Sequence, residues 1–223
     1  MKIVSQAHRI LTPISIDGHI ELQNLEHIAR ICYKSEGTVD SVNMGRTKEF
    51  IRRLIKNGHD AMLEHGYISV EFVTDRGVSH EIVRHRMASY AQESTRYCNY
   101  SQNRFGGEIS VILPEYIPKD TESKGYKYWY DSCLKAENRY FDLLDDGWSP
   151  QQARAVLPTC LKTQIVVTAN YREWRHILRL RCAKDAHPQM QALMKPLLEE
   201  LHGKFDVLFD DIYEGAFGLK GEK

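Results

Sequence analysis

The sequence lacks an excess of charge of either sign, because 30 Lys and Arg residues balance 30 Asp and Glu residues. No broad positive field is therefore available to attract nucleic acid or an anionic membrane surface, and neither is expected as a partner. The sequence also lacks an apolar run long enough to span a membrane, and its first residues have no apolar stretch typical of a signal peptide. We therefore expect a cytoplasmic protein.

Cysteine is scarce, and the few cysteines are scattered, odd in number and never at the two-residue spacing of a metal-binding pair. This usage favours a reducing compartment and argues against a zinc cluster. His59 and His65 also lack the i, i+4 spacing that zinc hydrolases use on a helix. No metal site is predicted. The cysteines are Cys32, Cys98, Cys133, Cys160 and Cys182.

Two nucleotide-binding motifs are absent as well. Neither Gly-x-Gly-x-x-Gly nor Gly-x-x-x-x-Gly-Lys-Ser/Thr occurs, so a bound dinucleotide cannot rest in the glycine-rich loop that these motifs build at a helix terminus. Side chains of Arg and His would have to make those contacts instead.

What the 223 residues do contain is a mixture of helical and strand-like periodicity without a regular alternation of the two. This pattern predicts an α+β fold in one domain spanning residues 1–223, with a central, mainly antiparallel sheet flanked by helices. A helix is expected to begin at Gly77 and to carry Arg84–Arg86, and Ser149 is expected to cap a helix that starts at Pro150. Apolar spacing predicts further helices at 22–32, 50–55, 126–146, 173–181 and 190–202, and strands at 67–73 and 162–168.

Residues 84–97 concentrate more charge and hydrogen-bonding groups than folding alone explains. The segment holds three Arg, one His, one Gln, one Glu and two Ser. Arginine forks and serine hydroxyls suit phosphate and carboxylate oxygens, while Tyr90, Tyr97 and Tyr100 offer stacking faces. The segment is therefore a candidate anion-binding surface; the alternative is a solvated helix end whose charges pair with one another.

The spacing within this segment forms a recognisable motif. Arg-His-Arg at 84–86 is followed by Ser89, Ser94 and Arg96. Three more segments agree in order: 57–65, 153–158 and 168–172, the last leading to Arg181. With these residues the sequence resembles the flavin-dependent thymidylate synthases over roughly residues 20 to 200.

The resemblance implies a methyltransferase that converts dUMP to dTMP. It implies 5,10-methylenetetrahydrofolate as the carbon donor, FAD as the redox carrier and NADPH as the reductant. It also implies a homotetramer whose sites take residues from more than one chain. Two alternatives remain open at this point: a sister enzyme that hydroxymethylates a pyrimidine nucleotide with the same cofactors, and a nucleotide or nucleic-acid binding protein without catalysis.

The resemblance also implies roles for individual residues on the nucleotide. Arg181 is expected to stabilise the charge on the deprotonated uracil, and Ser94 to lie near the reacting ring; these two are the predicted catalytic residues. From the residues alone, Arg181 lies on the apolar stripe of its helix, where an ion pair with Asp185 is the alternative to ligand binding. The residues implied to bind dUMP are Glu81, Arg84, Gln92, Glu93, Ser94, Thr95, Arg96, Arg154 and Arg181.

The flavin is implied to contact a second set of residues. Asn170 can cap a helix on which Arg172 and His176 share a face, although caps and exposed Arg/His pairs are ordinary on surface helices. His59 is either a structured loop residue or a group near the flavin ring. The residues implied to bind FAD are Arg84, His85, Arg86, Gln92, Asn170, Tyr171, Arg172, His176 and His59.

Two positions depart from the family pattern, and a third bears on a rival chemistry. Gln92 stands where many members have a carboxylate, so its amide is expected to retain binding with altered detail. Ala61 has no hydroxyl, which leaves at most its backbone for the flavin. Cys160 has no adjacent His, and we expect an inert buried thiol there and not the nucleophile of the cysteine-dependent thymidylate synthases.

Overall fold

The computed structural model describes residues 1–32, 34–35 and 43–218, and these fall into two compact units. The first unit comprises Met1–Arg9, Glu71–His85 and Tyr90–Val166. The second comprises Ile10–Val70, Arg86–Ser89 and Val167–Lys223. In the described part of the chain no helix is both long and apolar enough to cross a membrane.

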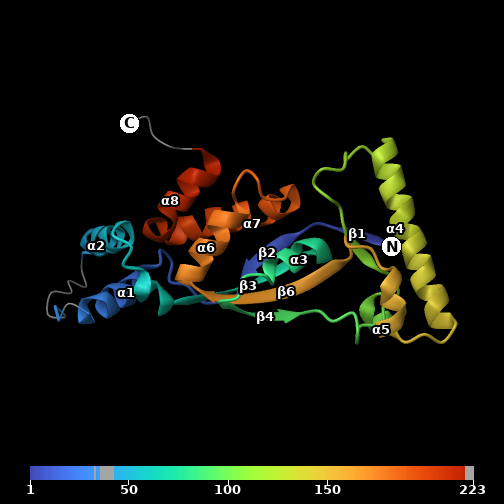
Figure 1. The fold of residues 1–223 in the computed structure, drawn as a ribbon, viewed down its shortest axis with the longest axis horizontal. Helices are drawn as coiled ribbons and strands as arrows, with labels where there is room; N and C mark the ends of the chain where they lie inside the picture. The colour runs from blue at the N-terminus through green and yellow to red at the C-terminus, as the bar shows by residue number, and fades with distance from the viewer. Residues whose placement is uncertain (33, 36–42, 219–223) are drawn as a thin grey trace. The chain divides into compact units, whose positions relative to one another are not determined.

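Helices and strands are mixed, as the sequence predicts (Figure 1). The first unit contains β1 (Lys2–Val4), α3 (Arg76–Ile82), β5 (Ser110–Ile112), α4 (Lys124–Asp145) and α5 (Pro150–Ala153), with short 3₁₀ turns at Asn103–Phe105 and Arg154–Val156. The second contains α1 (His19–Ile31), α2 (Met44–Lys56), the 3₁₀ turn η2 (Asp60–Glu64), α6 (Tyr171–Arg181), α7 (Pro188–Lys204) and α8 (Asp206–Phe217). Four further strands contribute residues to both units: β2 (Ala7–Ile10), β3 (Tyr67–Asp75), β4 (Ala88–Gln92) and β6 (Lys162–Asn170).

These four strands form one sheet in the order β2-β3-β6-β4. Along β2 and β3 the residue numbers run in opposite directions, because the Leu11 amide donates to the Ser69 carbonyl at 2.8 Å while Arg9 pairs with Glu71. The hydroxyls of Ser69 and Thr168 lie 2.8 Å apart across β3 and β6. The antiparallel sheet expected from the sequence is therefore present.

The sheet has one buried face, which follows from the alternation in β3. Ile68, Val70 and Phe72 are fully buried, and the residues between them are more exposed. Such alternation is what a half-buried strand requires. The predicted strand at 67–73 is confirmed.

The first unit has a core around the start of β6 and the long helix α4. A parallel pair, β1 with β5, lies in this unit in the register Ile3 to Val111, and the sequence did not predict it. The buried residues of this core are Tyr100, Ile109, Val111, Cys133, Tyr140, Ala153 and Leu161.

The second unit is built around three helices, α6, α7 and α8, which pack on one another. Trp174 on α6 is fully buried, and its indole N–H donates to the Ile68 carbonyl at 2.9 Å. Gly66 allows the Tyr171 ring to approach the backbone, since a Cβ at that glycine would lie 2.0 Å from the ring. This packing fixes α6, the helix on which several predicted site residues stand.

The predicted helices are confirmed in position, and one local prediction is wrong. Ser149 begins α5 with a capping box and Pro150 follows at the first helical position, as expected. Arg84–Arg86, however, do not lie on a helix, because α3 ends at Ile82. The strands β1, β2 and β5 and the helix α8 were not predicted.

Candidate functional site

The Arg-His-Arg motif lies in the turn that follows α3. Asp75 caps this helix by accepting a hydrogen bond from the Val78 amide at 2.7 Å. At the other end the Tyr90 hydroxyl lies 3.1 Å from the Ile82 carbonyl and also bonds the His85 carbonyl. Tyr90 therefore anchors the backbone of the motif through its hydroxyl, and stacking on its half-buried ring stays a prediction. His85 is buried, whereas Arg84 and Arg86 are exposed.

The side chain of Gln92, at the end of β4, is held by two buried hydroxyls. Its amide nitrogen donates to Ser79 Oγ at 2.9 Å and to Thr163 Oγ1 at 3.2 Å. The Ser79 hydroxyl donates its own proton to the Arg76 carbonyl at 3.0 Å, so it can only accept from Gln92. Since both amide protons are used within the chain, a ligand contact at Gln92 would be made by its carbonyl oxygen.

Glu93, the next residue, is engaged at both carboxylate oxygens. Tyr100 donates its hydroxyl to one oxygen at 2.9 Å, and the Lys162 ammonium donates to the other at 2.9 Å. Tyr100 is buried, and burial together with the Glu93 charge raises the pKa of its phenol. The face of Tyr100 is consequently not a stacking platform, contrary to the expectation from sequence.

A tight turn follows at residues 94–98. The Ser94 carbonyl accepts hydrogen bonds from the amides of Tyr97 at 3.2 Å and Cys98 at 3.0 Å. Arg154 donates to Thr95 Oγ1 at 3.1 Å, which brings together two predicted dUMP-binding residues that are 59 positions apart in the sequence. The guanidinium of Arg96 lies over the ring of Tyr97, 5.6 Å from its centroid. The turn thus presents hydroxyl and guanidinium donors that suit an anion.

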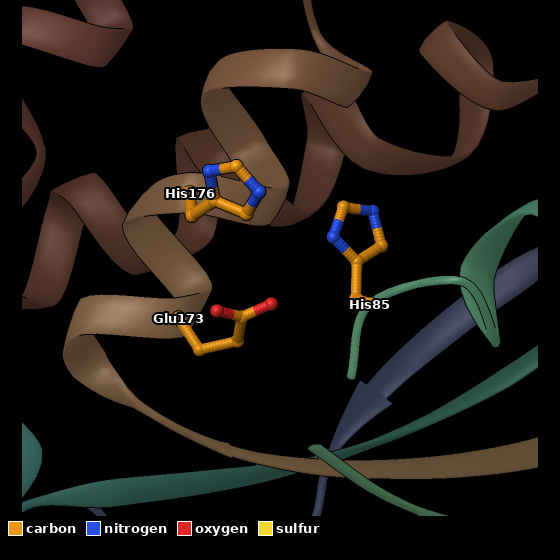
Figure 2. Close-up of side chains that lie close together, drawn as sticks. All are labelled: His85, Glu173 and His176. Atoms are coloured by element: carbon orange, nitrogen blue, oxygen red, sulfur yellow. The ribbon is translucent and has the colours of Figure 1, made fainter. Parts of the chain in front are cut away.

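In the second unit, the start of α6 carries the predicted flavin residues. Asn170 caps the helix by accepting from the Glu173 amide at 2.8 Å, as expected. Figure 2 shows Glu173 and His176 on α6, and places His85 in the turn after α3. Arg172 and His176 are exposed on the helix, whereas the Tyr171 ring is buried in the core. A flavin contact at Tyr171 could therefore involve only its backbone.

Two cavities in the second unit adjoin this helix. One, of about 410 Å³, is lined by Asn170, Arg172, Arg175, His176 and Arg179 together with Asp60, Glu64, Met87 and Glu173. The other, of about 420 Å³, is lined by Ala29, Cys32, Leu54, Gly58, His59, Asp60, Ala61, Met62 and Arg172. Arg172 and Asp60 line both.

This pair of cavities fits a flavin dinucleotide in chemistry. Guanidinium groups in the first suit the pyrophosphate, and the apolar side chains of Leu54 and Met62 in the second suit a flat ring system. His59 is among the predicted flavin residues that line the second cavity. Ala61 also lines this cavity, and its side chain brings no hydroxyl to it.

The comparisons with known proteins agree with this geometry. Residues 19–205 match the family described as thymidylate synthase complementing protein. A flavin-dependent thymidylate synthase from Corynebacterium aurimucosum is 32% identical over 205 residues, which cover 85% of this chain and 79% of the relative. The enzyme of the same name from Pyrococcus furiosus is 30% identical over 190 residues, covering 83% and 76%. This chain belongs to the flavin-dependent thymidylate synthase family.

The fold is also shared with a solved structure of lower sequence identity. The crystal structure of the UMP/dUMP methylase PolB from Streptomyces cacaoi, bound with 5-Br dUMP, superposes with a TM-score of 0.75 at 21% identity and covers 99% of this chain and 98% of that one. At this identity the likeness establishes the fold alone.

Arg181 and Cys160, two residues singled out from the sequence, are both half-buried. The buried arginine of α6 is Arg175, whose two terminal nitrogens each bond Asp211 at 2.9 Å, whereas Arg181 is half-buried. Cys160 is half-buried and its sulfur lies 3.4 Å from that of Cys133, whose S–H donation lowers the pKa of Cys160. The burial expected for Cys160 is only partial, and the inertness of its thiol stays a prediction.

Several residues of the site were missed from sequence. Arg179 continues the spacing of Arg172 and His176 along one face of α6, so helical periodicity would have found it. Ser79, Thr163 and Lys162 gave no signal, because the fold brings them to Gln92 and Glu93 from distant positions.

Proposed function

We propose that this chain catalyses the reductive methylation of dUMP to dTMP with 5,10-methylenetetrahydrofolate, FAD and NADPH. The observation that carries the proposal is the similarity, over more than four-fifths of the chain, to relatives named flavin-dependent thymidylate synthase. The anion-binding donors of the 94–98 turn and the arginine-lined cavity beside α6 supply suitable contacts for a nucleotide and a dinucleotide.

In this proposal the first unit holds the nucleotide with polar groups that are already oriented. The Gln92 carbonyl is available to a base or ribose donor, and Arg154, Thr95 and Arg96 contact the phosphate. Glu81, Arg84 and Ser94 complete the proposed dUMP set, together with Glu93, whose carboxylate is held within the chain by Tyr100 and Lys162. Fixed donors of this kind stabilise developing charge because they need no reorganisation during the reaction.

The second unit contains most of the proposed flavin residues and the proposed catalytic arginine. The proposed FAD set comprises His59, Arg86, Asn170, Arg172, His176 and the backbone of Tyr171 from that unit, and Arg84, His85 and Gln92 from the first. A flavin held by these residues would supply the hydride-transfer chemistry of the reaction. Arg181 stabilises the negative charge of the deprotonated uracil, which makes the ring carbon a better nucleophile without an enzyme thiol. Ser94 positions the ring.

The proposed assembly is a homotetramer whose sites draw on more than one chain. Arg84, Arg86 and Arg96 are exposed on the single chain, where they are available to an anionic ligand at a subunit boundary. Light scattering of the purified protein that gave only an active monomer would contradict this assembly.

The proposed reaction is tested by colour and by product. The purified protein should be yellow, and NADPH should bleach it under anaerobic conditions. Product analysis after incubation with dUMP and 5,10-methylenetetrahydrofolate should then give dTMP. A hydroxymethylated nucleotide would indicate the sister reaction, and a colourless protein that takes up no FAD would exclude both.

A further inference from the structure

Glu93 lies between the end of β4 and the 94–98 turn, and it is hydrogen-bonded on every side. Its carboxylate accepts from Tyr100 and Lys162, its amide donates to the Gln164 carbonyl at 2.9 Å, and its carbonyl accepts from Arg76 at 2.8 Å. The residue is therefore fixed at both backbone groups and at both side-chain oxygens. Ser94, the first residue of the turn, follows directly.

The ion pair in this arrangement is partly withdrawn from water. The Lys162 side chain is 22% exposed and the Glu93 side chain 18% exposed, and the ammonium makes a second bond to Gln164 at 3.1 Å. A pair with this little exposure is screened less by solvent than a surface pair. Glu93 and Lys162 thus form a hydrogen-bonded pair whose charges cancel locally.

Charge neutrality matters at this point of the chain because two of the next three residues, Thr95 and Arg96, are proposed to contact a phosphate. An unpaired carboxylate beside Ser94 would repel a nucleotide dianion, whereas the Lys162 ammonium cancels that charge. The same contact, together with the Tyr100 hydroxyl, holds the start of the turn that presents Thr95 and Arg96. Lys162 is not among the residues that the family resemblance implied.

We propose that Lys162 and Tyr100 are positioning residues of the nucleotide site: acting through Glu93, they fix the 94–98 turn and neutralise the carboxylate next to it. The ligand is a pyrimidine nucleoside monophosphate, so this inference rests on the proposed function. Glu93 then acts within the chain, and its predicted direct contact with dUMP is replaced by this indirect role.

The test uses the FAD-loaded enzyme and compares Lys162→Met with Lys162→Arg, Glu93→Gln and the double variant Lys162→Met/Glu93→Gln. Lys162→Met should raise the Kd and KM for dUMP about tenfold while kcat stays within about twofold and the bound FAD is unchanged. Lys162→Arg should stay within about twofold of the parent because the charge is kept. The double variant should recover most of the lost affinity, since the uncompensated carboxylate is gone.

Two further variants complete the design. Tyr100→Phe keeps the ring and removes the donor, and should raise the Kd for dUMP about threefold. Lys127→Met removes an exposed lysine of α4 that pairs with Glu122, and should leave the Kd unchanged. The inference is overturned if Lys162→Met binds dUMP as the parent does, or if the double variant binds no better than Lys162→Met.

Hydrogen exchange separates this inference from the reaction itself. The amides of Tyr97 and Cys98 should exchange faster in Lys162→Met than in the parent or in Lys127→Met, because the turn has lost its anchor. If the parent makes no dTMP, the proposed function fails, and the exchange result still decides the positioning role. Unchanged exchange at both amides would overturn it.

Discussion

The two candidate ligand-binding regions hold their polar groups in opposite ways. At the end of β4, Gln92 and Glu93 are bonded to buried or half-buried partners inside the first unit. On the exposed side of α6, Arg172 is 55% exposed and its partner Glu64 48% exposed, while Arg179 is 54% exposed. One region is fixed by internal hydrogen bonds, and the other presents hydrated charges to a cavity.

This difference predicts different responses to a ligand. A nucleotide that binds beside Gln92 meets groups whose orientation is already set, so little ordering is required on binding. A dinucleotide that binds beside α6 displaces water and weak surface pairs, so its affinity depends on charge and on salt. The predictions below test this contrast.

The largest effect on stability is expected from Gln92→Glu. Ser79 donates its proton to the Arg76 carbonyl, so a carboxylate at position 92 faces a hydroxyl oxygen that has no proton to offer. The substitution should lower the free energy of unfolding by about 2 kcal/mol, measured by urea denaturation at neutral pH. The matched control, Gln102→Glu at an exposed site, should change it by less than about 0.5 kcal/mol. Equal stability of the two variants would show that the amide orientation is not enforced.

The second prediction addresses the exposed region. Arg172→Met should weaken FAD binding about tenfold and make the Kd less dependent on salt, because one guanidinium leaves the cavity. Unfolding should be nearly unaffected, since the pair with Glu64 is solvent-exposed. Glu64→Gln should act in the opposite sense and tighten FAD binding, because it removes a competitor for Arg172. Fluorescence of the released flavin measures the Kd for FAD in both variants. A loss of stability in Arg172→Met would contradict the contrast between the two regions.

The third prediction concerns Arg175 on α6, which is held by two hydrogen bonds to Asp211. Burial alone would raise the pKa of Asp211, but the hydrogen bonds and charges of Arg175 and Arg179 outweigh it and hold that pKa below its ordinary 3.8. A carboxyl group whose pKa is lowered in the folded state stabilises the fold at pH values above its ordinary pKa. This stabilisation is lost as the pH falls through the pKa of the folded state.

Asp211→Asn should therefore destabilise the protein by about 1 kcal/mol at pH 7, a value reduced from that of a buried pair because Asp211 is half exposed. The gap between variant and parent should close as the pH falls below 3.8. Thermal unfolding across pH measures it, with Asp142→Asn at an exposed pair as the control. A gap that persisted at low pH would mean that the carboxylate charge is not what stabilises α6.

The contrast also explains which parts of the molecule could be predicted from sequence. Local periodicity predicted α1, α4, α6 and α7, and the Asn170 cap, because these depend on residues within a few positions of one another. The end of α3 was misplaced because the charged residues at 84–86 continue a helical register that the hydrogen bonds of Tyr90 interrupt.

For the site, the resemblance located the motif residues but not their internal partners. The donor to Glu93 lies 69 positions away at Lys162, and Thr163 lies 71 positions from Gln92. Such pairs are set by the antiparallel register of the sheet, which no single sequence window contains. The exposed region was easier to predict, since Arg172, His176 and Arg179 share one helix.

The smallest expected effect extends the contrast to thiol chemistry in the first unit, where Cys98 and Cys160 are both half-buried. Burial and the charge of Glu93 raise the pKa of Cys98, whereas hydrogen bonding from Cys133 lowers the pKa of Cys160. Iodoacetamide at pH 8 should therefore alkylate Cys160 about threefold faster than Cys98, because a lower pKa leaves more thiolate. In Cys133→Ala the donor is lost and the two rates should converge. Faster labelling of Cys98, or no change in Cys133→Ala, would show that exposure and not internal hydrogen bonding governs these thiols.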